Sequence, residues 1–266
     1  MTGILTEASG LLAAMEANYL SYFVGFAQLP YLELHSDPEI TWVSGNLPYW
    51  NSVLRAQLAT NRVTTRVEAT CAYFKSLKMS LLWQTLPSTQ PRDLGNYLKT
   101  CGLKSVGGRP HMAADLRNLP AELPIPPGLV IERVYDNASF DKWFQASVAG
   151  FEMSPDNAAI YADAYTALGF GLDGPFLHYV GYLQGEPVTS STLLLANGVA
   201  GIYDVSTARA ARRQGLGAAI TLAPLLEARA RGYRYAILQS SQEGYNVYRG
   251  LGFEEKYRED NYLLEN

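Results

Sequence analysis

The feature that most constrains this chain is a pair of glycines at the start of a helix. Residues 212–223 read RRQGLGAAITLA, so Gly215 and Gly217 lead directly into a long apolar, helix-forming segment. A glycine has no Cβ, which lets the backbone turn tightly and approach a ligand closely. The first N–H groups of a helix have no partner within the helix, and the helix dipole is positive there. The sequence therefore predicts an anion-binding loop, and phosphate is the anion most often bound in this way.

Length and composition exclude several classes of protein. The chain has 266 residues, which suits two domains of about 130 residues each. The net charge of −4 argues against nucleic-acid or membrane partners, and no uncharged apolar run reaches the roughly 18 residues of a membrane span. Cys71 and Cys101 are the two cysteines, and the N-terminus lacks a signal-peptide pattern, so we expect free thiols and a cytoplasmic location. The three histidines are far apart, and we expect no metal site.

A proline-rich stretch divides the chain. Four prolines fall within residues 117–134, RNLPAELPIPPGLVIERV, which excludes a continuous helix or a central strand there. We interpret residues 117–127 as a linker, followed by a strand from Leu129. The hydrophobic pattern beyond it predicts an α/β protein with a mixed α+β sheet. We expect helices at 139–150, 156–168, 217–231 and 242–249, and strands at 176–183, 187–196, 199–206, 235–239, 253–257 and 262–264.

The first half of the sequence is a faint copy of the second. Residues 64–85 read as a helix followed by a strand, as residues 217–239 do, and Gly102 aligns with Gly252. No Gly-x-Gly precedes the first-half helix, and Leu98 falls where Tyr248 stands. The pattern is typical of two related domains in tandem, the first of which has lost its anion loop.

Common phosphate-binding motifs do not fit the glycine loop. A dinucleotide fingerprint needs a third glycine where this chain has Ile220. The nucleotide-triphosphate loop needs Gly-Lys-Ser/Thr, and an α/β-hydrolase needs Gly-x-Ser-x-Gly, and the sequence contains neither motif.

The order of elements resembles the GCN5-related N-acetyltransferases (GNAT). The strand GIYDVST, the loop ARAARRQGLGAA, the long helix, the strand YAILQSS and the short helix with VYRGLGF follow one another as in that family. Its acetyl-CoA signature, Arg/Gln-x-x-Gly-x-Gly/Ala, is met by residues 212–217, and its Tyr-x-x-x-Gly-Phe element by residues 248–253. The resemblance covers residues 128–264 and is only faint over residues 1–116.

The resemblance implies a domain plan and a cofactor site. It implies a degenerate GNAT-like domain at residues 1–120 and a catalytic GNAT domain at residues 128–266, with acetyl-CoA (coenzyme A) as cosubstrate and no metal. In the family the pantetheine arm pairs with the strand before the loop, and the backbone N–H of Val205 is implied as a donor near the thioester carbonyl. The cofactor-binding residues implied are Val205, Arg212, Arg213, Gln214, Gly215, Leu216, Gly217 and Ala218. The Arg212-Arg213 pair is also consistent with a solvated basic end of the loop.

Two residues are candidates for catalysis by this resemblance. Tyr248 matches the family tyrosine that protonates the departing thiolate, and the alternative is a core tyrosine of a short helix. Asp204 is the candidate base, although the family acid more often lies where this chain has Gly201 and Ile202; the alternative is a hydrogen-bonded carboxylate at a strand end. Glu152 is a further candidate, for binding a cationic amine. The alternative is that Glu152 is an ordinary surface acid.

The predicted function is acetyl transfer from acetyl-CoA to a primary amine of a small molecule or peptide. A non-catalytic acyl-CoA sensor would keep the 212–217 loop without needing Tyr248 or Asp204, and stays open as the alternative. The first half is also compatible with a structural role such as a homodimer surface, because WVSGNLPYWNSVL is apolar enough for an interface or a core. The identity of the amine does not follow from the sequence.

Overall fold

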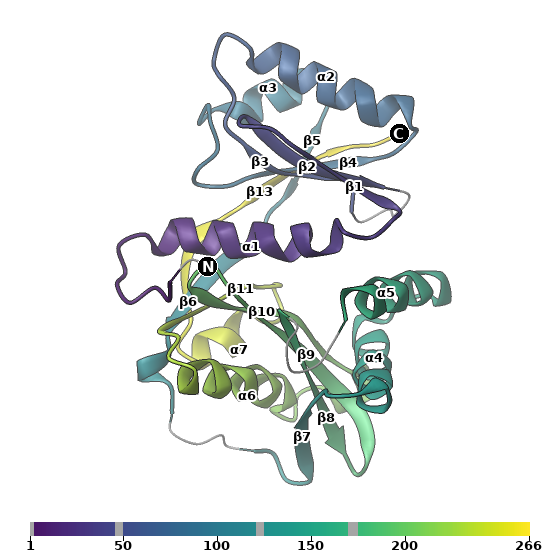
Figure 1. The fold of residues 1–266 in the computed structure, drawn as a ribbon, viewed down its shortest axis with the longest axis vertical. Helices are drawn as coiled ribbons and strands as arrows, with labels where there is room; N and C mark the ends of the chain where they lie inside the picture. Colours follow the sequence, from purple (N-terminus) through teal and green to yellow (C-terminus); the bar gives the residue numbers. More distant parts are fainter. Residues whose placement is uncertain (1–2, 46–49, 121–124, 170–174) are drawn as a thin grey trace. The chain divides into compact units, whose positions relative to one another are not determined.

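A computed structural model describes residues 3–45, 50–120, 125–169 and 175–266 (Figure 1). The chain forms two compact units. The larger unit comprises Met1–Tyr19 and His111–Lys256, and the smaller unit comprises Leu20–Pro110 and Tyr257–Asn266. These limits differ from the halves 1–120 and 128–266 expected from the sequence, because each unit takes chain from both halves. Part of the expected 117–127 linker lies outside the described residues.

The larger unit is built on a seven-stranded sheet in the order β12-β6-β11-β10-β9-β8-β7. Its β10–β11 pair is parallel, whereas β7, β8, β9 and β10 pair in antiparallel succession. The strands are β6 (Pro110–Asp115), β7 (Leu129–Arg133), β8 (Phe176–Leu183), β9 (Glu186–Ala196), β10 (Val199–Thr207), β11 (Tyr235–Gln239) and β12 (Glu254–Arg258). The helices are α4 (Asn137–Phe151), α5 (Pro155–Leu168), α6 (Leu216–Ala230) and α7 (Tyr245–Gly250), together with the start of α1 (Leu11–Phe26).

Helices cover both faces of this sheet, with α6 and α7 on one side and α4 and α5 on the other (Figure 1). Neighbouring residues of β9 show the two faces, because side chains alternate along a strand. The Ser190 hydroxyl meets Ser147 of α4 at 3.0 Å, and the Ser191 hydroxyl donates to the Ile220 carbonyl of α6 at 2.8 Å. Strand β9 is therefore covered on both sides, and Ser190 and Ser191 are both fully buried.

Local sequence signals set the ends of α4 and α5. Asp136 caps α4 by accepting from the Ser139 backbone N–H at 2.8 Å, and the Ser139 hydroxyl reaches back in a capping box. Ser154 caps α5, and Pro155 occupies the first helical position, where its missing N–H costs nothing. Both helices begin within two residues of the positions expected from the sequence.

The smaller unit has a six-stranded sheet in the order β1-β2-β3-β4-β13-β5. Its core joins the sheet to α2 and α3 and includes Trp83, Phe74 and Leu98, each fully buried. The strands are β1 (Leu32–Ser36), β2 (Ile40–Gly45), β3 (Ser52–Ala56), β4 (Leu81–Thr85), β5 (Lys104–Gly107) and β13 (Asp260–Leu264). The helices are α2 (Val63–Ser76) and α3 (Leu94–Thr100); one-turn 3-10 helices at Leu116–Asn118 and Arg209–Ala211 belong to the larger unit.

The two units repeat one plan and exchange one strand. The segments from α3 to β6 and from α7 to β13 share the same order, and Gly102 and Gly252 end the helices with φ of 93° and 87°. The strand expected at 262–264 is part of β13, and β6 and β13 each lie in the sheet of the other repeat. Strand β6 stands between β11 and β12, and β13 stands between β4 and β5.

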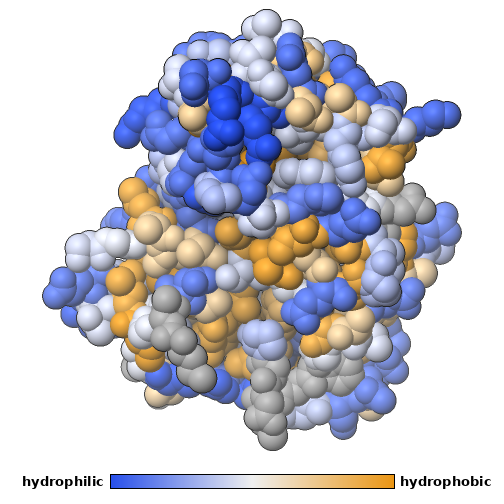
Figure 2. Space-filling view, turned by 45° about the horizontal axis from the view of Figure 1, so that its top comes forward, coloured by the Kyte–Doolittle hydropathy of each residue, from blue (hydrophilic) through white to orange (hydrophobic). Residues whose placement is uncertain are grey.

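Some large apolar side chains remain at the surface. Val106, Ile125, Val130 and Tyr135 each keep more than half of their area exposed, and hydrophobic residues are interspersed with hydrophilic ones on the face drawn in Figure 2. The expectation of a homodimer, which would cover such side chains, stays a prediction. Among the described residues, no helix is long and apolar enough to cross a membrane.

Helix α6 is fastened to β9 through a proline inside the helix. Pro224 has no N–H, so it cannot donate to the Ile220 carbonyl four residues earlier. The fully buried Ser191 hydroxyl donates to that carbonyl instead, at 2.8 Å. One hydrogen bond thus satisfies a carbonyl freed by the proline and fixes α6 against the sheet, which in turn fixes the glycine loop at its start.

We expect Ser191→Ala to lower the free energy of unfolding by about 1–3 kcal/mol, because the Ile220 carbonyl is left buried without a donor. Adding Pro224→Ala should recover much of that loss, because the alanine N–H reaches the same carbonyl within the helix. Urea unfolding of the parent, both single variants and the double variant measures the coupling. A double variant no more stable than Ser191→Ala would contradict this account of the proline.

Candidate functional site

The candidate site begins where two strands of the larger unit part. The parallel pairing of β10 with β11 extends only from Ala200↔Ala236 to Ile202↔Leu238. Strand β10 continues to Thr207 along β9, while β11 ends at Gln239. In the described part of the chain, no backbone hydrogen bond joins residues 203–207 to the segment that follows β11. The parallel ladder between β10 and β11 therefore stops after Ile202 and Leu238.

A β-bulge lies in this last part of β10, between Tyr203 and Ser206. Tyr203 pairs with Thr192 and Ser206 pairs with Ser190, so Asp204 and Val205 both stand opposite Ser191. Asp204 has φ of 50°, in the left-handed region that non-glycine residues seldom adopt. Bulges redirect side chains and are common beside active sites. This one gives Asp204 and Val205 orientations that the regular alternation of the strand does not provide.

The Asp204 carboxylate is held by a tyrosine of α5. The Tyr165 hydroxyl donates to Asp204 Oδ2, and the Tyr165 ring is fully buried. That ring packs edge-on against Trp143 and the His178 imidazole, with ring centroids 4.9 Å and 5.2 Å away. Asp204 is thus a hydrogen-bonded carboxylate at the bulge rather than a freely solvated one.

The glycine loop presents a row of backbone N–H groups. Arg213 and Gly215 have φ of 64° and 82°, and α6 begins at Leu216 without a side-chain cap. Within the described chain, no carbonyl or side chain accepts from the N–H groups of residues 213–218. Left-handed residues in the turn before a helix direct such N–H groups toward a common point, which makes an anion-binding concavity. Gln214, Gly217 and Ala218 contribute to the same row.

The two loop arginines differ in what they contact. The Arg212 guanidinium donates to the carbonyls of Thr207 at 3.0 Å and Gly150 at 2.9 Å, and to the Glu152 carboxylate at 3.1 Å. It ties the end of β10 to the end of α4 and occupies Glu152 in an ion pair. Arg213 is exposed and makes no ion pair with the described residues. Arg213 is therefore the arginine available to an anion at the loop.

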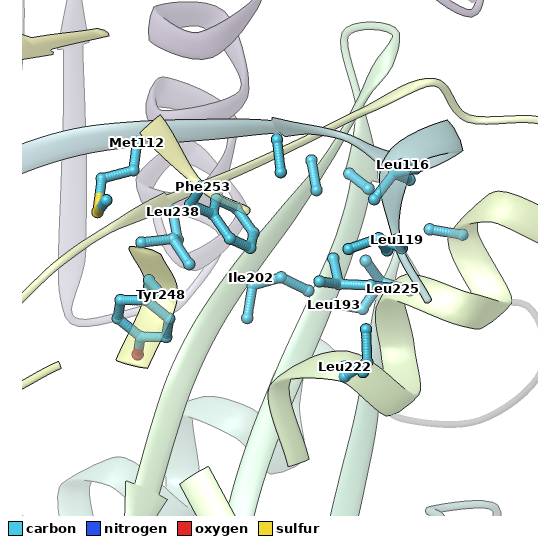
Figure 3. Close-up of a cluster of buried hydrophobic side chains, with 14 of the residues drawn as sticks. Met112, Leu116, Leu119, Leu193, Ile202, Leu222, Leu225, Leu238, Tyr248 and Phe253 are labelled. Carbon is cyan, nitrogen blue, oxygen red and sulfur yellow. The ribbon is translucent and has the colours of Figure 1, made fainter. Parts of the chain in front are cut away.

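Tyr248 lies at the edge of the core of the larger unit. It stands on α7, is 9% exposed and belongs to the same buried cluster as Ile202 and Leu238, against which Val205 packs. Figure 3 shows its hydroxyl pointing away from Leu238 and Phe253. Burial raises the pKa of the Tyr248 phenol to about 12, because the phenolate would lose its hydration. The group is a proton donor at neutral pH.

The smaller unit fills the equivalent opening with its own chain. Strands β3 and β4 pair in parallel only at Ser52↔Leu82 and Val53↔Trp83. Beyond that point the Gln90 N–H donates to the Ala56 carbonyl at 3.0 Å, and the Leu58 N–H donates to the Gln90 carbonyl at 2.8 Å. Gln90 thus takes the place of a strand partner just after β3, in a parallel bridge with Gln57. Local sequence patterns do not predict this pairing, because Gln90 follows Ala56 by 34 residues and reaches it by way of a turn.

The cysteines lie in the smaller unit, and His178 lies in the larger unit beside Tyr165. Cys71 and Cys101 are free thiols that line one hollow of about 360 Å³ between α2 and α3, and burial raises the pKa of Cys71 to about 11. His178 is buried in the larger unit, where desolvation lowers its pKa to about 3. Among the described residues, His, Cys, Asp and Glu form no group of three or more able to hold a metal ion.

Comparison with solved structures identifies the architecture. A GCN5-related N-acetyltransferase from Kribbella flavida matches with a TM-score of 0.73 at 19% identity over 96% of both chains. One from Sphaerobacter thermophilus gives 0.68 at 16% identity over 97% of this chain and 91% of that one. A tandem GNAT protein from the clavulanic acid biosynthesis pathway gives 0.63 at 14% identity over 99% and 97%.

The chain has a tandem GNAT fold. The whole-chain coverage by a tandem GNAT structure confirms the prediction of two copies made from the sequence. At these identities the likeness establishes the fold of the GNAT units and not their activity. No protein-family model and no curated protein sequence matches the chain.

We expect the Tyr248 phenol of the larger GNAT unit to resist ionisation. Its pKa of about 12 exceeds the ordinary value of 10.0, so the unfolded chain ionises first as the pH rises. The stability advantage of the parent over Tyr248→Phe should therefore be fully present below pH 10 and shrink toward pH 12 by up to about 1.4 kcal/mol per pH unit. Unfolding free energies of both proteins across that window measure it. A constant difference would show an ordinary solvated phenol.

Proposed function

We propose that this protein is an acetyl-CoA-dependent N-acetyltransferase acting on a primary amine of a small molecule or peptide. The observation that carries the proposal is the row of backbone N–H groups at residues 213–218, for which the described residues supply no acceptor, after the end of β10 that extends beyond its pairing with β11. The solved structures named as N-acetyltransferases support acetyl transfer in general. They leave the acceptor open.

The residues present fit coenzyme A by their chemistry. The N–H row, the positive end of α6 and the unpaired Arg213 suit a pyrophosphate. Beyond its pairing with β11, β10 offers N–H and C=O groups to an extended amide chain, as a neighbouring strand would. Arg212 contributes by shaping the loop from behind rather than by contacting phosphate, since its guanidinium is already engaged.

Three groups of the larger unit then divide the chemistry. Bound acetyl-CoA supplies a thioester, whose carbonyl carbon bonds to the amine nitrogen and whose thiolate leaves. Asp204 takes the proton that the amine must lose, and Tyr165 holds the carboxylate in place for it. The Val205 N–H donates toward the oxygen on which negative charge develops. Tyr248, kept protonated by burial, donates its proton to the departing sulfur.

The alternative is an acyl-CoA sensor that binds without turnover. It would use the loop but would give Tyr248 and Asp204 no chemical task. Two observations favour the enzyme: the buried, protonated phenol points away from its own cluster, and the acid lies in a bulge rather than in regular strand geometry. We also propose that the smaller unit binds no coenzyme A, because Gln90 occupies its opening.

We expect one molecule of acetyl-CoA to bind per chain, and Gly217→Glu to abolish that binding. The space at Gly217 is open, since an added Cβ would meet only Thr207 Oγ1 at 3.9 Å. The variant therefore acts through its negative charge at the pyrophosphate site. Gly217→Gln, which is similar in size and uncharged, should bind more tightly than Gly217→Glu. Calorimetry gives stoichiometry and affinity, and two sites per chain or an unimpaired Gly217→Glu would refute the assignment.

We expect Tyr248→Phe to slow acetyl transfer by roughly 10²–10⁴, the usual effect of losing one positioned proton donor. Acetyl-CoA affinity should stay nearly unchanged, because the loop holds the pyrophosphate. Free-thiol release with an acceptor found by screening amines measures the rate. Tyr245→Phe, three residues earlier on α7, is the matched control and should keep the parent rate. A Tyr248→Phe protein with parental turnover and weaker binding would mean that the ring only packs against the cofactor.

A further inference from the structure

Strand β10 carries a glycine whose missing side chain is replaced by a residue from the N-terminal helix. A Cβ on Gly201 would lie 2.2 Å from Asn18 Oδ1 and 2.6 Å from the Tyr203 ring, both far closer than atoms can pack. Asn18 belongs to the part of α1 that lies in the larger unit. The absence of a side chain at Gly201 therefore leaves room for the Asn18 amide against β10, the strand that carries the candidate site.

Asn18 is fully buried, and its hydrogen bonds reach both strands of the β9–β10 hairpin. Its side-chain amide donates to the carbonyls of Ala196 at 2.9 Å, Val199 at 3.3 Å and Leu194 at 3.4 Å. Its Oδ1 accepts from the Tyr203 hydroxyl at 2.8 Å. One side chain thus anchors the turn end of the hairpin and the residue directly before Asp204.

This anchor lies where both ladders of β10 are interrupted. Pairing with β11 stops at Ile202, and the bulge interrupts pairing with β9 after Tyr203. Side chains hold the bulge itself, because the Tyr165 hydroxyl donates to the Asp204 carboxylate and the Ser190 hydroxyl donates to the Asp204 carbonyl at 3.1 Å. The bond from Tyr203 to Asn18 adds a restraint at the last residue before the bulge.

We propose that Asn18 is a positioning residue that, through Tyr203, fixes the Asp204–Val205 bulge for acetyl transfer. The first half of the chain thereby supplies part of the working site of the second half, although it has lost its own loop. This inference rests on the proposed function for its effect on catalysis. Its effect on the strand does not depend on any activity.

The test uses the full-length chain with two independent readouts. Tyr203→Phe removes only the hydroxyl, and Asn18→Ala removes the whole anchor. Tyr262→Phe, a buried tyrosine of the smaller unit, makes the same chemical change away from β10. Backbone hydrogen exchange at residues 203–206 in the absence of acetyl-CoA reports on the strand. Turnover and acetyl-CoA affinity report on the reaction.

The anchor variants should raise exchange at residues 203–206 and lower kcat at least tenfold, since small displacements of reacting groups are costly. Their acetyl-CoA Kd should stay within about twofold, because the pyrophosphate loop is separate. The control should change neither. Unchanged exchange overturns the inference whatever the activity, and raised exchange with parental kcat overturns the role in catalysis. A parent without transfer activity, but with raised exchange in the variants, refutes the proposed function and supports the anchor.

Discussion

The divergence of β10 from β11 after Ile202 and Leu238 is the constraint on which the rest of the larger unit depends. Inside a sheet, the backbone N–H and C=O groups are normally hydrogen-bonded to neighbouring strands. Where two strands diverge, those groups need other partners, such as side chains, water or a ligand. Here the bulge at Asp204 lies on one side of the opening, Tyr248 lies in the cluster below it, and the glycine loop follows the strand that forms its edge. The candidate binding groups and the candidate catalytic groups thus all lie near the point where the β10–β11 ladder ends.

The smaller unit shows the same interruption with a different outcome. Its strands part after Val53 and Trp83, but Gln90 pairs with the free edge of β3. The strands diverge in both units, so the divergence belongs to the GNAT fold. Gln90 pairs beside the divergence in the smaller unit, whereas β10 and β11 have no such bridge among the described residues of the larger unit. The smaller unit also keeps Leu98 where the larger one has Tyr248, so it carries no phenol at that place.

The strand exchange ties each unit to both halves of the sequence. The sheet of the smaller unit would lack β13 between β4 and β5 in a fragment ending at residue 120. The sheet of the larger unit would likewise lose β6, and with it the partner on one side of β11, in a fragment beginning at residue 128. Removing the first half of the chain would therefore break the β6–β11 ladder within the sheet of the larger unit.

Local chemistry was enough for the sequence to determine the glycine loop, the order of helices and strands after Leu129, and the faint repeat with its missing loop. These follow from turn residues, helix signals and hydrophobic periodicity within a few residues. The exchange of β6 and β13 could not be read, because two similar strands fit either sheet locally and only long-range pairing decides between them. The engagement of Arg212 by Thr207 and Gly150, the closure of the first opening by Gln90, and the bond from Tyr203 to Asn18 across 185 residues depend on tertiary contacts. No local pattern encodes such contacts, because their partners meet only when the sheet has formed.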